Sequence, residues 1–162
     1  MYKVAVLTVS DKGSQGKRED LSGKKIIEIV EKKGYSVEKY DIVADEKEAI
    51  KEKLIQYCNQ NIELILTTGG TGFSKRDVTP EATLEISEKL CLGISEAIRN
   101  YSMTITKRAM LSRAVSVIRQ NSIIINLPGS PKAVEESLEY IIETLEHAIK
   151  ILNGESSECA RK

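Results

Sequence analysis

The sequence contains very little histidine, and its cysteines are few and scattered. His147 is the only histidine, and it falls on the polar side of an amphipathic helical segment, where we predict a solvated surface residue. A mechanism based on histidine is therefore not expected. Cys58, Cys91 and Cys159 are odd in number and lack the spacing of metal ligands. We predict reduced thiols rather than a disulfide framework or a zinc site.

The sequence also lacks net charge, aromatic residues and long apolar runs. Lysine plus arginine and aspartate plus glutamate both count 24, and aromatic residues make up 4%. A nucleic-acid partner is not expected, because neither a basic surface nor stacking platforms are available. No segment approaches the roughly 18 consecutive apolar residues of a membrane span, and residues 1–4 lead directly into a predicted strand instead of a signal peptide. We predict a cytoplasmic protein without a membrane partner.

Apolar segments alternate with amphipathic ones along the 162 residues, of which 41% are hydrophobic. The predicted strands cover residues 2–9, 36–43, 63–67 and 122–127. The predicted helices cover residues 20–33, 46–58, 80–89, 95–102 and 131–152. Residues 12–19 are predicted to form a loop, and residues 107–120 show no clear pattern. The alternation predicts one α/β domain over residues 1–154 with a parallel, doubly wound sheet, followed by a flexible tail over 155–162.

In such a sheet the ligand crevice lies outside the carboxyl ends of the strands, so the loops there are candidate sites. The segment Thr68-Gly69-Gly70-Thr71-Gly72 follows the third strand. Its glycines allow close approach of the backbone to a ligand, and its N–H groups and hydroxyls suit an anion. It matches neither the Walker A pattern nor G-x-G-x-x-G. The sequence predicts a phosphate-binding loop, and a tight structural turn is the alternative.

Charged residues follow this loop closely. Asp77 comes directly after Lys75 and Arg76. A carboxylate for Mg²⁺ and cations for an anionic transition state are what phosphoryl or nucleotidyl transfer requires, although solvated charges at a helix terminus are the alternative. Asp45 follows the second strand and is expected at the same sheet edge as Asp77, or else as a helix cap, the role also expected for Thr79.

Two further strand ends carry polar residues. Ser10-Asp11 follows the first strand, and Pro128-Gly129-Ser130-Pro131-Lys132 follows the last, where Ser130 and Lys132 are able to bind an anion. Ordinary turns are the alternative at both places. Ser112-Arg113, and Glu96 with Arg99, are polar groups in apolar surroundings. Salt bridges or contacts between subunits compete there with ligand binding.

The string Thr68-Gly69-Gly70-Thr71-Gly72 with Arg76-Asp77-Val78-Thr79-Pro80-Glu81-Ala82 closely resembles the MogA/MoaB family of molybdenum-cofactor-synthesis proteins. Segments 10–11, 45–46, 111–114 and 126–132 fall where that family has its recurrent segments, so the resemblance covers residues 2–152. It implies a three-layer α/β/α sandwich that binds molybdopterin and assembles as a homotrimer. It also implies transient contact with the molybdenum-insertion protein.

Enzymatic members of the family adenylylate the terminal phosphate of molybdopterin with Mg-ATP and release pyrophosphate, whereas some MoaB-type members bind the pterin without evident catalysis. Residues 77–80 look more like the MogA type, and residues 21–23 and 129–131 look intermediate. The phosphate nucleophile is already anionic, so no strong general base is needed. The missing histidine is therefore compatible with this reaction.

The resemblance also implies roles for individual residues. Asp45 and Asp77 match the catalytic carboxylates that hold Mg²⁺ against the phosphates of ATP. The remaining implied site residues bind phosphate, nucleotide or pterin, and they are Ser10, Asp11, Thr68, Gly69, Gly70, Thr71, Gly72, Ser112, Arg113, Pro128, Gly129, Ser130 and Lys132. Arg76 and Lys75 are the candidate cations for the leaving pyrophosphate.

Overall fold

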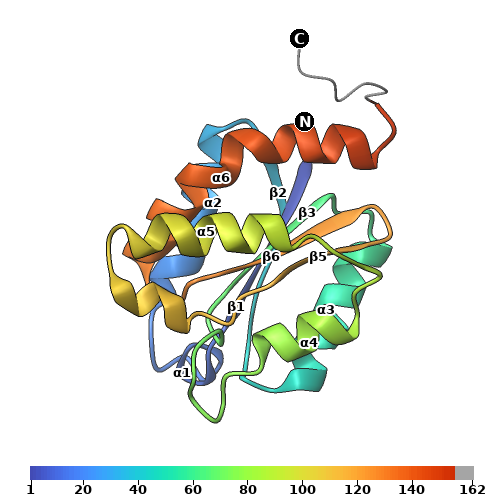
Figure 1. Ribbon diagram of the computed structural model, residues 1–162. Coiled ribbons are helices and arrows are strands. Elements are labelled where there is room, and N and C mark those ends of the chain that lie inside the picture. The colour runs from blue at the N-terminus through green and yellow to red at the C-terminus, as the bar shows by residue number, and fades with distance from the viewer. Residues whose placement is uncertain (156–162) are drawn as a thin grey trace.

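A six-stranded sheet lies between two helical layers in the computed structural model, which describes residues 1–155 (Figure 1). One face of the sheet is covered by α2 (Leu21–Lys32), α5 (Leu92–Met103) and α6 (Pro131–Leu152). The other face is covered by α3 (Lys47–Asn59) and α4 (Thr79–Glu85). The predicted three-layer α/β/α sandwich is confirmed. The tail predicted over 155–162 lies, except for residue 155, outside the described residues.

The sheet is mostly parallel, as predicted, and its strand order is β2-β1-β3-β6-β5-β4. The four parallel strands are β1 (Lys3–Val9), β2 (Ser36–Val43), β3 (Leu64–Thr68) and β6 (Ser122–Leu127). Two short antiparallel strands, β5 (Ser116–Arg119) and β4 (Lys89–Leu90), extend the sheet beyond β6. The carboxyl ends of the four parallel strands therefore meet at one edge.

Burial on both faces explains why the central strands are apolar at nearly every position. In β1, Val4 and Val6 pack in the core beneath α2 and α6, whereas Ala5 and Leu7 pack in the core beneath α3 and α4. Successive side chains of a strand point to opposite faces, so a strand between two helical layers needs an apolar residue at each position.

The helices begin and end close to the predicted positions where the apolar period is strong. In α6, side chains three and four residues apart are buried, from Val134 to Ile149. Its first residue follows Ser130, whose hydroxyl accepts a hydrogen bond from the N–H of Ala133. The predicted helices over 20–33 and 46–58 differ from α2 and α3 by one residue at each end.

Several segments with a weak pattern were predicted incorrectly, and one was left unassigned. The predicted loop over 12–19 contains most of α1 (Asp11–Ser14), and the unassigned interval 107–120 holds η1 (Lys107–Leu111) and β5. The helix predicted over 80–89 ends earlier because residues 89–90 pair with β5, and the helix predicted over 95–102 begins earlier. Strands of two and four residues are too short to show a period.

The predictions for the cysteines and the histidine agree with the structure within residues 1–155. Cys58 is buried and Cys91 is partly buried, and both are free thiols, whereas Cys159 lies outside the described residues. His147 is exposed on α6. Over residues 1–155, no helix combines the length and apolar character needed to cross a bilayer.

Candidate active site

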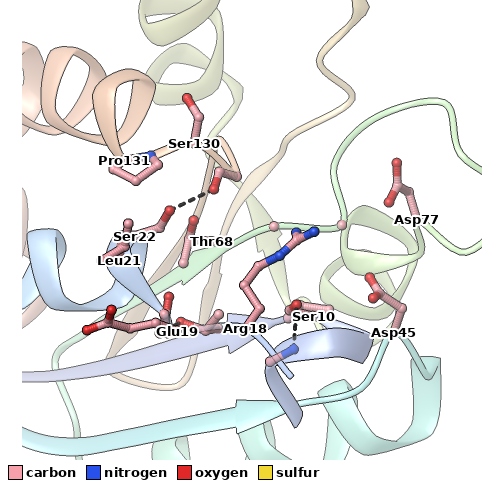
Figure 2. Close-up of a pocket in the computed structure, with 17 residues that line it drawn as sticks. Ser10, Arg18, Glu19, Leu21, Ser22, Asp45, Thr68, Asp77, Ser130 and Pro131 are labelled. Carbon is pink, nitrogen blue, oxygen red and sulfur yellow. Dashed lines mark hydrogen bonds between the residues drawn. The ribbon is translucent and has the colours of Figure 1, made fainter. Parts of the chain in front are cut away.

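A cavity of about 570 Å³ lies at the carboxyl ends of the four parallel strands (Figure 2). Each strand contributes the residues that follow it: Ser10 after β1, Asp45 after β2, Gly69 and Gly70 after β3, and Gly129 after β6. The chain leaves β1 and β3 toward opposite sides of the sheet, and such switch points are where open α/β sheets bind ligands. The expected convergence of these loops on one edge is confirmed.

The glycine loop lies against its neighbours without room for side chains. Gly69 has φ +92°, and a Cβ atom there would overlap the carbonyl oxygen of Val9. Gly70 has φ +68°, and a Cβ atom there would overlap Thr79 Oγ1 and lie 3.2 Å from Asp45 Oδ1. L-residues rarely adopt these conformations. Glycine is therefore required at both positions, and the loop backbone faces the cavity directly.

Thr79 holds this loop instead of capping a helix. Its hydroxyl donates to the carbonyl oxygen of Gly69 at 2.9 Å, and its N–H donates to that of Gly70 at 3.1 Å. The residue before α4 is Val78, which makes no side-chain cap, so the capping role predicted for Thr79 is wrong. A buried hydroxyl that satisfies a loop carbonyl fixes the loop more firmly than a solvated one.

Asp45 is held at the cavity by Asp11 and does not cap α3. Asp11 N–H donates to Asp45 Oδ2 at 2.9 Å, and Asp45 N–H donates to Asp11 Oδ1 at 3.0 Å. The N-cap of α3 is Glu46, without a side-chain cap. Burial, together with the charges of Asp11 and Asp77, raises the pKa of Asp45. The charge of Arg76 and the Asp11 N–H offset only part of this rise.

Asp77 faces the same cavity from the far side of the glycine loop (Figure 2). Its Oδ2 accepts a hydrogen bond from Ser74 N–H at 3.1 Å. Within residues 1–155, no hydrogen bond involves Oδ1 of Asp77 or Oδ1 of Asp45. One oxygen of each carboxylate is therefore available to a ligand.

This pair of carboxylates fits a magnesium site completed by substrate. Among the described residues, no three acidic, histidine or cysteine side chains form a protein-only metal site. Mg²⁺ usually takes one or two carboxylates and completes its coordination with water and substrate phosphates. Asp45 and Asp77 supply that number of carboxylates beside a loop whose backbone is open to phosphate.

Arg76 is engaged with protein groups. Its guanidinium donates to Asp11 Oδ2 at 3.0 Å, to Asp11 Oδ1 at 2.9 Å and to Glu46 Oε1 at 2.8 Å. The Arg76 hydrogen bond holds the pKa of Asp11 below its usual value. Arg76 thereby links the loop after β3 to α1 and to the start of α3, and it supports the Asp11–Asp45 pair from outside the cavity.

Arg113 likewise supports the site from outside the cavity lining. Its guanidinium donates to the carbonyl oxygens of Gly72 at 2.8 Å and Asp77 at 2.9 Å, and it pairs with Glu81. The Arg113 N–H also donates to the carbonyl oxygen of Thr71 at 2.9 Å. Three contacts from one residue therefore fix the loop that carries Asp77, and the fourth ties that residue to α4.

Removing the Arg113 guanidinium is expected to destabilise the fold. Arg113→Gln should lower the free energy of unfolding by about 1–3 kcal/mol, because loop carbonyls and Glu81 lose their charged partner. Urea denaturation measures this change. Arg108→Gln is the matched control, since no side-chain hydrogen bond or ion pair of Arg108 occurs in residues 1–155, and it should change stability by less than about 0.5 kcal/mol. Equal stability of the two variants would contradict the assignment.

The structure brings together only part of the predicted site. The predicted residues that line the cavity are Ser10, Asp45, Thr68, Gly69, Gly70, Asp77, Gly129 and Ser130. The others lie outside this lining, and they are Asp11, Thr71, Gly72, Arg76, Ser112, Arg113, Pro128 and Lys132. The side chains of Asp11, Arg76 and Arg113 lie outside the cavity because they form the hydrogen bonds described above. Roles of this second group in binding substrate stay predictions.

Sequence analysis missed the segment between α1 and α2. Arg18, Glu19 and Asp20 line the cavity together with Leu21 and Ser22. Arg18 and Glu19 belong to the predicted loop over 12–19, which begins near the carboxyl end of β1, and that position was the available signal. The structure shows how it is fixed: the Asp20 carboxylate accepts hydrogen bonds from Thr8, Tyr40 and Gly23 at 2.5–2.9 Å.

Comparisons of the sequence with known proteins identify its family. Residues 5–147 match the family model described as "Probable molybdopterin binding domain". A molybdopterin adenylyltransferase of Helicobacter pylori is 40% identical over 156 residues, covering 93% of this chain and 88% of the relative.

Solved structures of the same family superpose closely. The molybdopterin biosynthesis enzyme MoaB of Thermus thermophilus gives a TM-score of 0.89 at 41% identity, covering 95% of this chain and 98% of the other. The tungsten cofactor synthesizing protein MoaB of Pyrococcus furiosus gives a TM-score of 0.86 at 35% identity, covering 94% of this chain and 97% of the other. On the match of sequence and fold, this chain belongs to the MogA/MoaB family of molybdenum cofactor biosynthesis proteins.

Proposed function

We propose that this protein adenylylates the terminal phosphate of molybdopterin, using Mg-ATP and releasing pyrophosphate. The observation that carries the proposal is the pair of available carboxylates, Asp45 and Asp77, beside the glycine loop in the main cavity. Relatives named molybdopterin adenylyltransferase, 38–42% identical to this chain, support the choice of substrate and reaction.

The reaction does not require a general base, because the attacking phosphate oxygen is already ionised. A phosphate oxygen of molybdopterin forms a bond to the α-phosphorus of ATP, and the bond from that phosphorus to the oxygen bridging to the β-phosphate breaks. The electron pair and the negative charge leave on pyrophosphate. Catalysis then depends on alignment of the phosphates and on compensation of their charge.

Each part of the cavity has a task in this reaction. Asp45 and Asp77 would hold Mg²⁺, which would supply positive charge to offset that of the reacting phosphates. The backbone of Gly69 and Gly70 lies against the phosphates, where any side chain would intrude. Asp11 keeps Asp45 in place through the paired backbone hydrogen bonds.

Magnesium alone is expected to stabilise the fold. Relief of the repulsion between Asp45 and Asp77 favours the bound state, and for a dissociation constant of about 1 mM, roughly 10 mM Mg²⁺ contributes about 1.4 kcal/mol. The expected rise in melting temperature is about 2–5 °C. Thermal unfolding with MgCl₂, compared with NaCl of equal ionic strength, measures it. An equal rise in the Asp45→Asn variant would argue against this site.

The second candidate function is a non-catalytic molybdopterin carrier. It is the alternative implied by the resemblance to MoaB-type members, some of which bind the pterin without evident catalysis. Incubation of the purified protein with molybdopterin, ATP and Mg²⁺, followed by measurement of pyrophosphate, separates the two. Release that requires both substrates supports the adenylyltransferase, whereas bound molybdopterin without release supports the carrier.

Three expectations from the family complete the proposal: assembly as a homotrimer, a cytoplasmic location and transient contact with the molybdenum-insertion protein. Apolar side chains exposed around α5 and η1 support assembly, because such side chains are usually covered in an oligomer. They are Leu90, Leu92, Ile105, Met110 and Leu111.

A further inference from the structure

Arg18 is the only lysine or arginine among the described residues that line the main cavity. Its side chain enters from the segment between α1 and α2 and extends toward the glycine loop, on the side of Asp45 and Asp77 (Figure 2). The other charged groups of the lining are carboxylates: Glu19, Asp20, Asp45 and Asp77.

The other basic residues near the cavity are used elsewhere or lie outside it. The guanidinium of Arg76 is occupied by Asp11 and Glu46, and that of Arg113 by Glu81 and two carbonyl oxygens. Lys75 and Lys132 are not part of the lining. Phosphate groups that enter the cavity would therefore meet the cationic side chain of Arg18 alone.

The donors of Arg18 are available to a ligand. Within residues 1–155, its side chain makes no hydrogen bond or ion pair, and it is exposed. The neighbouring carboxylate of Asp20 is already bonded to Thr8, Tyr40 and Gly23. A guanidinium presents several N–H groups in a planar fork that matches two phosphate oxygens, and such charge-assisted bonds are stronger than neutral ones.

We propose that Arg18 binds the phosphate groups of the substrates in this cavity. The inference rests on the proposed function, in which both substrates carry phosphate and the leaving group is pyrophosphate. Arg18 supplies a positive charge to a cavity whose other charged side chains are all carboxylates. The phosphate comes either from the nucleotide or from molybdopterin, and binding measurements with each distinguish the two sources.

The test compares Arg18→Gln with Lys17→Gln, the adjacent exposed cation that does not line the cavity. Calorimetric titration with pyrophosphate in the presence of Mg²⁺ and fluorescence titration with molybdopterin are done without turnover. Arg18→Gln is expected to weaken binding of one phosphate ligand by roughly 10- to 100-fold, Arg18→Lys by less, and Lys17→Gln by under about twofold. All three variants should keep the wild-type melting temperature, so a folding defect would be visible.

Weaker binding of pyrophosphate alone assigns Arg18 to the nucleotide, and weaker binding of molybdopterin alone assigns it to the pterin substrate. Either result supports the proposal. Arg18→Gln indistinguishable from Lys17→Gln with both ligands, or a wild-type protein that binds neither, overturns it. The proposed reaction fails separately, if the wild-type protein binds both ligands but releases no pyrophosphate from ATP.

Discussion

Replacing Asp77 by asparagine is expected to reduce adenylyl transfer by about 10³-fold while molybdopterin still binds. The amide has the shape of the carboxylate, and its oxygen can still accept the hydrogen bond from Ser74 N–H, so the loop keeps its conformation. The change removes one of the two negative charges that we propose hold Mg²⁺ in the site, and a lost transition-state interaction of this kind lowers kcat strongly. Steady-state release of pyrophosphate measures the loss.

The matched control is Asp41→Asn. Asp41 lies on β2 outside the cavity lining, where its carboxylate bonds to Tyr57 and Lys53. This variant should keep kcat within about twofold at a temperature well below its melting temperature. Full activity of Asp77→Asn would exclude the role of this carboxylate as a metal ligand. Loss of molybdopterin binding would show that Asp77 binds the pterin substrate, which would contradict its proposed role.

The second large effect is expected from Gly69→Ala. The added methyl group would overlap the carbonyl oxygen of Val9 and force an L-residue to φ +92°, so the loop must move away from β1. We expect a loss of about 2–3 kcal/mol in the free energy of unfolding, or roughly 4–10 °C in melting temperature. Transfer of AMP should fall at least about 100-fold, because the displaced loop no longer aligns the phosphates.

Gly93→Ala is the control for this substitution. Gly93 lies in the first turn of α5, and a Cβ atom there meets nothing within 4 Å. Alanine is favoured over glycine in a helix, so this variant should be as stable as the wild type or slightly more stable, with full activity. An active Gly69→Ala variant with unchanged melting temperature would mean that the loop tolerates a side chain and that its close contact with β1 is unimportant.

Strong periodic patterns predicted the fold well. The β-branched run at the start of the chain predicted β1, and the long apolar stripe of residues 131–152 predicted α6. The alternation of these elements placed Ser10, Asp45, Gly69 and Gly129 at one sheet edge. What it could not predict was β5, because four residues, of which two are only partly buried, show no period.

Contacts between distant loops could not be predicted from sequence. Arg76 and Lys75 were the two candidate cations for the leaving group, and the sequence did not predict that Arg76 bonds to Asp11, 65 residues away, and to Glu46. Local patterns explained Asp45 equally well as a helix cap and as a site residue, and they did not predict its partner Asp11, which is 34 residues away. Arg18 was overlooked because a charge in an aperiodic segment is ordinarily solvated. Side-chain pairing across loops depends on tertiary geometry, and the chain offers no local signal for it.

The most direct test follows the α-phosphate of ATP. Purified wild-type protein is incubated with molybdopterin, Mg²⁺ and ATP labelled at the α-phosphate. The pterin product is then separated, and its mass is measured by mass spectrometry. We expect one labelled AMP on each product molecule, an equal amount of pyrophosphate, and about 10³-fold slower formation of both with Asp77→Asn. Molybdopterin that is bound by the wild-type protein but recovered without label would contradict the proposed reaction.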